Sequence, residues 1–282
     1  MYILLLHMIN LITSFFRPEN TERLNELVVC LKNNINSKYI KKIYLFMERK
    51  EDIEFLKETI KTTGNKIQLI LWNKQPFYSD YLNLANQLKG EICMISNADI
   101  WLKECDVELI NLIKTNKNIG YALTRHEYDM SCPLIERSLN AGKISRLYQS
   151  YDSFIFKSPI NINYKLISHI QNRMGAENIF KIELEKIGIQ FVNPCKCIIT
   201  VHEHKSCVRT YDEKDDMLTA SSYHRLKYTP IANTHQIINH FNTKTPEKDL
   251  IRTPPITKKQ LTNSLIQPSG KKFKSTFARL LR

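Results

Sequence analysis

Asn97 and Asp99 are the residues of this sequence whose types and spacing point most directly to chemistry. They follow the apolar run from Ile92 to Ser96, which is typical of a strand buried on both faces of a parallel sheet. Open α/β sheets bind ligands beyond the carboxyl ends of such strands, where carboxylate and amide oxygens hold hard cations. We therefore expect a metal site here, although an Asx turn that only caps the next segment would use the same residues.

Three later features supply an acid or base and further ligands. Glu177 begins a predicted helix, where the macrodipole favours an ionised carboxylate, although acids are also common there for stability alone. His202 and His204 alternate on a predicted strand, so both imidazoles point together into a site or into solvent. Nearby cysteines complete a set large enough for zinc: Cys195, Cys197 and Cys207. The spacings C-x-C and H-x-H are not those that structural zinc sites favour, so zinc is the weaker interpretation.

Alternating strands and helices must position these residues. A first strand ends near Ser14, and leucine or valine then recurs with helical spacing at positions 24, 27, 28 and 31. Further apolar strands are predicted at residues 43–47, 67–72 and 92–96. Short strands divided by helices of about 10–15 residues imply right-handed crossovers and a parallel sheet. The first half therefore predicts a Rossmann-like α/β layer.

The second half continues this pattern less regularly. A helix is predicted at residues 108–114, a strand at 119–123, another strand from Tyr151, and a helix between Gly175 and Gly188. One strand is predicted from Ile189 to Val201, interrupted at Pro194. Residues 128–151 show no clear periodicity, which is more typical of a functional loop region than of packing.

The net charge of +13 is concentrated at the end of the chain. Residues 244–282 hold ten basic and two acidic residues, so they carry +8 of it. We expect a folded domain at residues 1–210 and a basic extension at 211–282, partly helical or disordered. A basic tail behind a nearly neutral body suits an anionic membrane surface or an acidic partner better than nucleic acid, and a solvated tail without a partner is the alternative.

The seven cysteines indicate a reducing compartment, because their number is odd and several lie in apolar runs. The apolar start of the chain lacks a basic segment and a small-residue cleavage site, so we interpret it as a first strand and not as a signal peptide. These observations predict a cytoplasmic protein that the tail holds at the periphery of a membrane.

Missing signatures narrow the chemistry. The sequence has no G-x-G-x-x-G after its first strand, no G-x-x-x-x-G-K-[ST] and no G-x-S-x-G, which argues against dinucleotide binding, P-loop phosphoryl transfer and α/β-hydrolase chemistry. A nucleotidyltransferase would also place a carboxylate-bound metal after a strand, but that class usually carries a glycine-rich phosphate loop near the first strand. A nucleic-acid-binding protein would need a stripe of basic residues interleaved with aromatic residues inside the folded body. The sequence lacks such a stripe, which argues against this class.

Six segments together carry a resemblance to a known family. In chain order they read LITSFFRP, LNLANQLKGEICMISNADIWL, YALTRHEY, YDSFIF, GAENIFKIELEKIGIQFVNPC and VHEH. This order resembles GT-A-fold glycosyltransferases that use nucleotide-sugar donors, of the kind found in bacteria and large DNA viruses, over about residues 8–210. The resemblance implies a Rossmann-like fold with a mostly parallel sheet flanked by helices, and transfer of a hexose from a nucleoside-diphosphate sugar, most simply a UDP-sugar, to a hydroxyl of a glycan or other acceptor.

The resemblance also implies roles for individual residues. The D-x-D motif that holds Mn²⁺ or Mg²⁺ on the donor diphosphate falls on Asn97-Ala98-Asp99, with Asp99 the stronger ligand, and the metal-binding histidine falls on His202 or His204. Glu177 falls on the catalytic base of inverting members. The remaining expected contacts to donor or acceptor are Ser14, Phe15, Arg17, Asn86, Arg125 and Asp152, of which Asp152 would hold sugar or acceptor hydroxyls.

Overall fold

The structure of the chain is a computed structural model. The structure describes residues 8–60, 65–133, 151–171, 173, 175–206, 208, 229 and 231–243. The chain divides into two units, Met1–Arg252 and Thr253–Arg282, and the second lies wholly outside the described residues. Residues 134–150, which make up most of the loop region predicted at 128–151, also lie outside them, as do Cys207 and the basic tail from residue 244.

The first half contains the predicted alternation of strands and helices. Its elements are β1 (Ile9–Phe15), α1 (Thr21–Asn36), β2 (Ile40–Met47), α2 (Lys50–Thr59), β3 (Ile67–Leu71), α3 (Tyr78–Gln87) and β4 (Ile92–Ser96). Asn20 caps α1 by accepting a hydrogen bond from the backbone N–H of Arg23, which satisfies one of the free donors at the helix start.

The second half is more irregular. Its elements are β5 (Ile100–Cys105), α4 (Val107–Thr115), β6 (Ile119–Leu123), β7 (His126–Glu127), β8 (Ser153–Lys157), the 3₁₀ turn η2 (Tyr164–Ile167), α6 (Ala176–Lys186), β9 (Gln190–Val192), β10 (Ile198–His202) and α7 (Thr234–Thr243). The single strand predicted from Ile189 to Val201 is wrong, because β9 and β10 belong to two different sheets on either side of Pro194. The strands β5 and β7 have no counterpart in the sequence analysis.

The central sheet has seven strands in the order β3-β2-β1-β4-β8-β6-β9. Neighbours pair in parallel except where β8 lies between β4 and β6, to both of which it is antiparallel. A second sheet of three strands has the order β5-β10-β7. The predicted α/β class with a mostly parallel central sheet flanked by helices is therefore confirmed.

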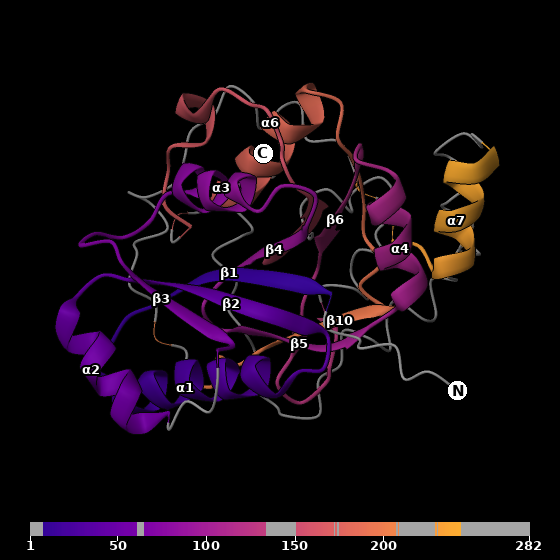
Figure 1. The fold of residues 1–282 in the computed structure, drawn as a ribbon. Helices are drawn as coiled ribbons and strands as arrows, with labels where there is room; N and C mark the ends of the chain where they lie inside the picture. The colour runs from indigo at the N-terminus through magenta and orange to yellow at the C-terminus, as the bar shows by residue number, and fades with distance from the viewer. Residues whose placement is uncertain are drawn as a thin grey trace, which may run out of the picture. The chain divides into compact units, whose positions relative to one another are not determined.

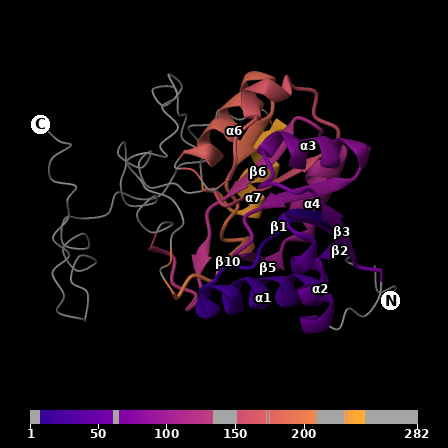
Figure 2. The same cartoon turned by 90° about the vertical axis from the view of Figure 1, so that its left-hand side faces the viewer.

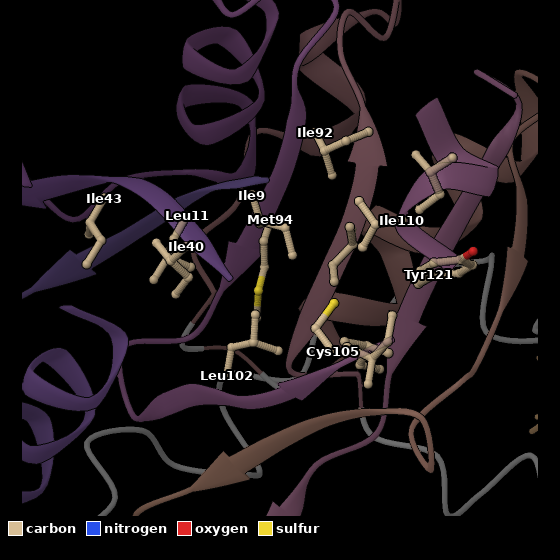
Figure 3. Close-up of a cluster of buried hydrophobic side chains, with 14 of the residues drawn as sticks. Ile9, Leu11, Ile40, Ile43, Ile92, Met94, Leu102, Cys105, Ile110 and Tyr121 are labelled. Carbon is tan, nitrogen blue, oxygen red and sulfur yellow. The ribbon is translucent and has the colours of Figure 1, made fainter. Parts of the chain in front are cut away.

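Helices cover both faces of the central sheet, as Figures 1 and 2 show from two directions, with α1 and α2 on one face and α3 and α6 on the other. Along β4 the side chains alternate between the two faces: Ile92 and Met94 join the core with α1, α2 and α4, whereas Cys93 and Ile95 join the core with α3 and α6. Figure 3 shows the first of these cores, in which Leu102 of β5 meets Met94. Burial on both faces explains why β4 is apolar without alternation.

Helix α7 packs on α4 although it lies within the predicted extension. Ile237 is fully buried in the same core as Ile110 of α4, and Thr234 Oγ1 donates a 2.5 Å hydrogen bond to Asp106 Oδ2 at the start of α4. This part of the extension therefore belongs to the folded unit. In the part of the chain that the structure describes, no helix is long and apolar enough to cross a membrane.

Candidate active site and metal centre

The site is organised around the turn that joins β4 to β5. This turn lies at the carboxyl end of β4, which pairs with β1, next to the point where the strand order reverses and open α/β sheets bind their ligands. Two backbone hydrogen bonds hold it in place: Asn97 N–H donates to the Asp152 carbonyl at 3.0 Å, and Glu203 N–H donates to the Asp99 carbonyl at 3.0 Å. The turn is thus fixed between β8 and the end of β10.

Strand β10 brings two histidines to Asp99. It pairs antiparallel with β5, and His202 lies opposite Ile100. In consequence Asp99 Oδ2 lies 3.2 Å from His202 Nε2 and 3.7 Å from His204 Nδ1, and the two imidazoles stack with centroids 5.1 Å apart. The resemblance implied one of these histidines, and the structure brings both to the turn.

The three side chains fit a metal ion. Their ligand atoms all lie within 4.8 Å of one another, and no other group of three His, Cys, Asp or Glu side chains among the described residues comes as close. Burial favours the neutral acid, yet the hydrogen bond with His202, the nearby imidazole of His204 and the charge of Arg23 hold the pKa of Asp99 well below its usual range. One carboxylate and two imidazoles suit Mn²⁺, Fe²⁺ or Zn²⁺ better than Mg²⁺, which prefers oxygen ligands.

Glu127 orients His202 from behind. Its Oε2 lies 3.0 Å from His202 Nδ1, and this carboxylate–imidazole pairing directs Nε2 towards Asp99, as is usual for metal-binding histidines. Burial works against the charged imidazole, but hydrogen bonds with Asp99 and Glu127 raise the pKa of His202 to about 9. The same pairing, with the charge of Arg125, lowers the pKa of Glu127 to about 2 despite its burial. A divalent ion would therefore replace a proton on His202.

Arg23 also contacts the metal centre, which the sequence analysis missed. One guanidinium nitrogen lies 2.7 Å from Asp99 Oδ2 and the other lies 3.0 Å from Glu26 Oε2. Arg23 comes from the first turn of α1, 76 residues before Asp99. Neither its spacing nor its neighbours in the sequence set it apart from other arginines on helix surfaces.

A second group of polar side chains adjoins the metal centre. Asp152, which immediately precedes β8, accepts hydrogen bonds at its Oδ1 from Asn97 Nδ2 at 3.2 Å and from Arg125 Nη1 at 2.9 Å. Asn97 also bonds to Glu177, while its own Oδ1 is buried with no hydrogen-bond partner among the described residues. A bound ligand or metal could use that free acceptor, which agrees with the weaker ligand role expected for Asn97.

Glu177 lies in the first turn of α6, as predicted, but its protonation differs from the expectation. Desolvation by burial and the charge of Asp152 raise the pKa of Glu177 to about 8, and the opposing effects of its own backbone N–H, Asn97 and Arg125 are smaller. The predicted ionised state at neutral pH is therefore wrong, because desolvation by burial, together with the charge of Asp152, outweighs the helix macrodipole.

The residues expected around the nucleoside separate into two groups. Ser14 lies at the carboxyl end of β1, where its hydroxyl bonds to Tyr81, and Arg17 is exposed over the Phe55 ring at 4.9 Å. Phe15, however, is buried to 2% exposure and stacks on the other face of the core against Phe55. Ser14 and Arg17 therefore remain partly or fully accessible, whereas Phe15 is a core residue and not a surface contact for a nucleoside.

Asn86 does not belong to the site. Its side chain bonds to the backbone of Ile160 and to the hydroxyl of Tyr164, and it lies at the end of α3 that leads into the amino end of β4. A helix that returns antiparallel to its strand carries its last turn to the edge opposite the ligands. Asn86 therefore secures the segment after β8.

Of the three cysteines weighed for zinc, the structure describes Cys195 and Cys197, and neither lies with the histidines at Asp99. Cys195 is fully buried, and its carbonyl bonds to His126. Neither Cys195 nor Cys197 belongs to the group of ligand atoms near Asp99. The zinc set weighed from the sequence is therefore not formed by the described residues.

Comparisons with known proteins were made against families, curated sequences and solved structures. No family model and no curated protein matches the chain. GalNAc-T7 with UDP, GalNAc and Mn²⁺ matches 69% of this chain with a TM-score of 0.46. A mannosyltransferase from Pyrobaculum calidifontis in complex with GDP-Man and Mn²⁺ matches 69% with a TM-score of 0.44. A 4-diphosphocytidyl-2C-methyl-D-erythritol synthase from Anaerococcus prevotii matches 74% with a TM-score of 0.40.

All three structures are 12% identical to this chain. The chain spans 43% and 56% of the lengths of the two glycosyltransferases. Identities and TM-scores this low transfer no activity, so function is inferred below from the geometry of the site.

Proposed function

We propose that the chain is a metal-dependent glycosyltransferase that moves a hexose from a nucleoside-diphosphate sugar, with UDP as the first choice, to a hydroxyl of a glycan or other acceptor. The observation that carries the proposal is the metal-ligand group Asp99, His202 and His204, with ligand atoms within 4.8 Å of one another, beside the carboxyl groups of Asp152 and Glu177. The fold alone is shared by proteins of many activities.

The ligand set accounts for departure of the diphosphate. A divalent ion held by Asp99, His202 and His204 would stabilise the negative charge that grows on the diphosphate as the sugar leaves. Two imidazoles among three ligands favour Mn²⁺ over Mg²⁺. Glu127 fixes the orientation of His202, and the buried Asn97 Oδ1, which lies on the same turn as Asp99, offers a further acceptor.

Glu177 is the proposed catalytic base. Its raised pKa of about 8 makes the ionised form a stronger proton acceptor than an ordinary carboxylate. Asp152 already accepts hydrogen bonds from Asn97 and Arg125 at one oxygen, which suits a residue that orients sugar or acceptor hydroxyls. A base that deprotonates the acceptor as it attacks opposite the diphosphate gives an inverted anomeric centre.

The test is a panel of nucleotides measured with and without Mn²⁺ by thermal shift and calorimetry. The proposal expects nucleoside diphosphates and their sugars to raise the melting temperature only with the metal, by an amount that grows with ligand concentration. Stabilisation by nucleoside triphosphates with release of pyrophosphate would instead identify a nucleotidyltransferase, and metal-independent stabilisation by DNA or RNA would identify a nucleic-acid-binding protein. Turnover of a matching donor, followed by NMR of the product anomer, then tests inversion.

A further inference from the structure

Arg23 places a fixed positive charge on the carboxylate oxygen that a metal would use. Its Nη2 lies 2.7 Å from Asp99 Oδ2, the same oxygen that faces His202 and His204. The Arg23 side chain is only 12% exposed. The helix does not need this side chain, because Asn20 caps α1 through the backbone of Arg23.

Other contacts keep the guanidinium in place. Its Nη1 donates to Glu26 Oε2 at 3.0 Å and towards the Glu203 carbonyl at 3.4 Å. Glu26 is itself held, because its Oε1 accepts from Ser206 N–H at 2.6 Å and its Oε2 from the Ser206 hydroxyl at 3.0 Å. Arg23 and Glu26 thus connect α1 to the segment that carries His204, so a metal ion would bind with this cation still beside it.

The charge has opposite effects on the two ligands of the proposed reaction. A guanidinium within a few ångströms of a dication repels it, and in a partly buried site this repulsion is only weakly screened. The same guanidinium attracts the oxygens of a diphosphate, which arginine binds well. Metal alone is therefore disfavoured, whereas metal together with a diphosphate is favoured.

We propose that Arg23 is a specificity-determining residue that makes metal binding conditional on a nucleoside diphosphate and that helps to bind its phosphates. This inference rests on the proposed function, since it assumes the metal centre at Asp99. By linkage, the factor by which the diphosphate strengthens metal binding equals the factor by which the metal strengthens diphosphate binding, so Arg23 acts on one measurable coupling.

Calorimetry on the full chain measures this coupling with three titrations: Mn²⁺ alone, UDP alone, and UDP at saturating Mn²⁺. In Arg23→Gln we expect Mn²⁺ alone to bind roughly 10-fold tighter and UDP with Mn²⁺ to bind roughly 10-fold weaker than in the wild type. Arg23→Lys keeps the charge and should stay near the wild-type values for Mn²⁺. Lys186→Gln removes one positive charge, paired with Glu183 on α6, and should change neither titration.

A second variant, for which the expected change in Mn²⁺ affinity has the opposite sign, distinguishes an effect of charge from structural damage. Glu26→Gln keeps Arg23 but removes the carboxylate that partly neutralises it, so Mn²⁺ alone should bind more weakly than in the wild type. Structural damage to the site would instead weaken Mn²⁺ binding in both Arg23→Gln and Glu26→Gln. Either that result or an unchanged Mn²⁺ affinity in Arg23→Gln overturns the role of Arg23. Failure of the wild type and of Arg23→Gln to bind Mn²⁺ even with UDP overturns the metal site and the proposed function with it.

Discussion

At the scale of single residues, the two carboxylates of the site differ because of their surroundings. Asp99 is surrounded by His202, His204 and Arg23, which hold its pKa well below the usual range despite burial. Glu177 is also desolvated but faces the charge of Asp152, and its pKa rises to about 8. These opposite pKa shifts suit the two proposed roles, in which Asp99 binds a cation and Glu177 accepts a proton.

Removing Asp99 should abolish metal-dependent binding of UDP. Asp99→Ala deletes the one anionic ligand of the group, so we expect the Mn²⁺-dependent part of UDP affinity to fall by more than about 100-fold, beyond the range typical of residues that only support a ligand. Asn97→Ala should lose less, because a neutral amide contributes less to a dication than a carboxylate does. Unchanged Mn²⁺-dependent affinity in Asp99→Ala, measured by calorimetry, would refute the metal assignment.

Glu177→Gln should lower kcat by about 10²–10⁴ and leave donor affinity nearly intact, since the amide keeps the shape and loses the basicity. In the wild type kcat should rise with pH and level off above a pKa of about 8, where Glu177 becomes ionised. The variant should lose this rise. Near-normal turnover in Glu177→Gln, or a product of retained anomeric configuration, would show that Glu177 is not the base and would make Asp152 the next candidate.

At the scale of elements, the site exists because two sheets meet at the turn after β4. The turn and Asp152 lie at the ends of strands of the central sheet, whereas the small sheet supplies His202 and Glu127, and His204 follows shortly after β10. In the small sheet, His202 of β10 pairs with Ile100 of β5 on one side and with Glu127 of β7 on the other. The row from Asp99 through His202 to Glu127 therefore links the three strands through a charged imidazole.

This row makes the stability of the metal-free chain depend on pH. The folded pKa of His202, about 9, lies above its ordinary value of 6.5, so its contribution is fully present below pH 6.5 and is lost as the pH rises through 9. Each kcal/mol lost lowers the Tm by about 2–4 °C in a protein of this size. We expect the Tm of metal-free protein to fall between pH 6.5 and 9, measured by calorimetric scanning.

The control for this prediction is His202→Gln. Glu177 also favours low pH, because its folded pKa is raised, so the difference between wild type and variant isolates the histidine. With saturating Mn²⁺ the wild-type trend should flatten or reverse, because the metal binds the neutral imidazole and competes with the proton. A Tm difference between the two proteins that does not change with pH would contradict the charged state of His202.

At the scale of the whole molecule, most of the net positive charge and the proposed site lie in different parts of the chain. The proposed site is formed by residues between 14 and 206, whereas residues 244–282 carry +8 of the net charge of +13. We therefore propose that this tail attaches the enzyme to an anionic surface or an acidic partner and takes no part in turnover.

A chain that ends at Thr243 tests this separation, because it keeps α7. It should retain Mn²⁺-dependent UDP binding and turnover on a soluble acceptor, and it should lose binding to phosphatidylserine vesicles, to which each basic residue near the surface contributes about 1 kcal/mol. Vesicle sedimentation at low and high salt measures the second property. If the shortened chain folds but loses turnover, the tail belongs to the active site.

Much of the fold could be predicted from the sequence because burial leaves a local pattern. The helix of α1, the two-sided burial of β4 and the turn at Asn97 and Asp99 are all visible in short stretches of chain. Strand pairing leaves no such pattern, which is why β9 and β10 were predicted as one strand and β5 was missed. The two-residue spacing of His202 and His204 predicted that they share a face, but not that this face meets Asp99.

Only the tertiary structure decided which side chains act on one another. Arg23 reaches Asp99 from a helix 76 residues away, and Asn86 points to the opposite edge of the sheet because of the direction in which α3 returns. The protonation of Glu177 likewise depends on its burial and on the charge of Asp152, which lies near Glu177 in the folded chain but far from it in the sequence. Residue types and periodicity determine which ionisable groups are present and which segments are buried. The protonation states of these groups depend on distances between segments that are far apart in the sequence. Those distances are fixed only when the two sheets and their helices pack together.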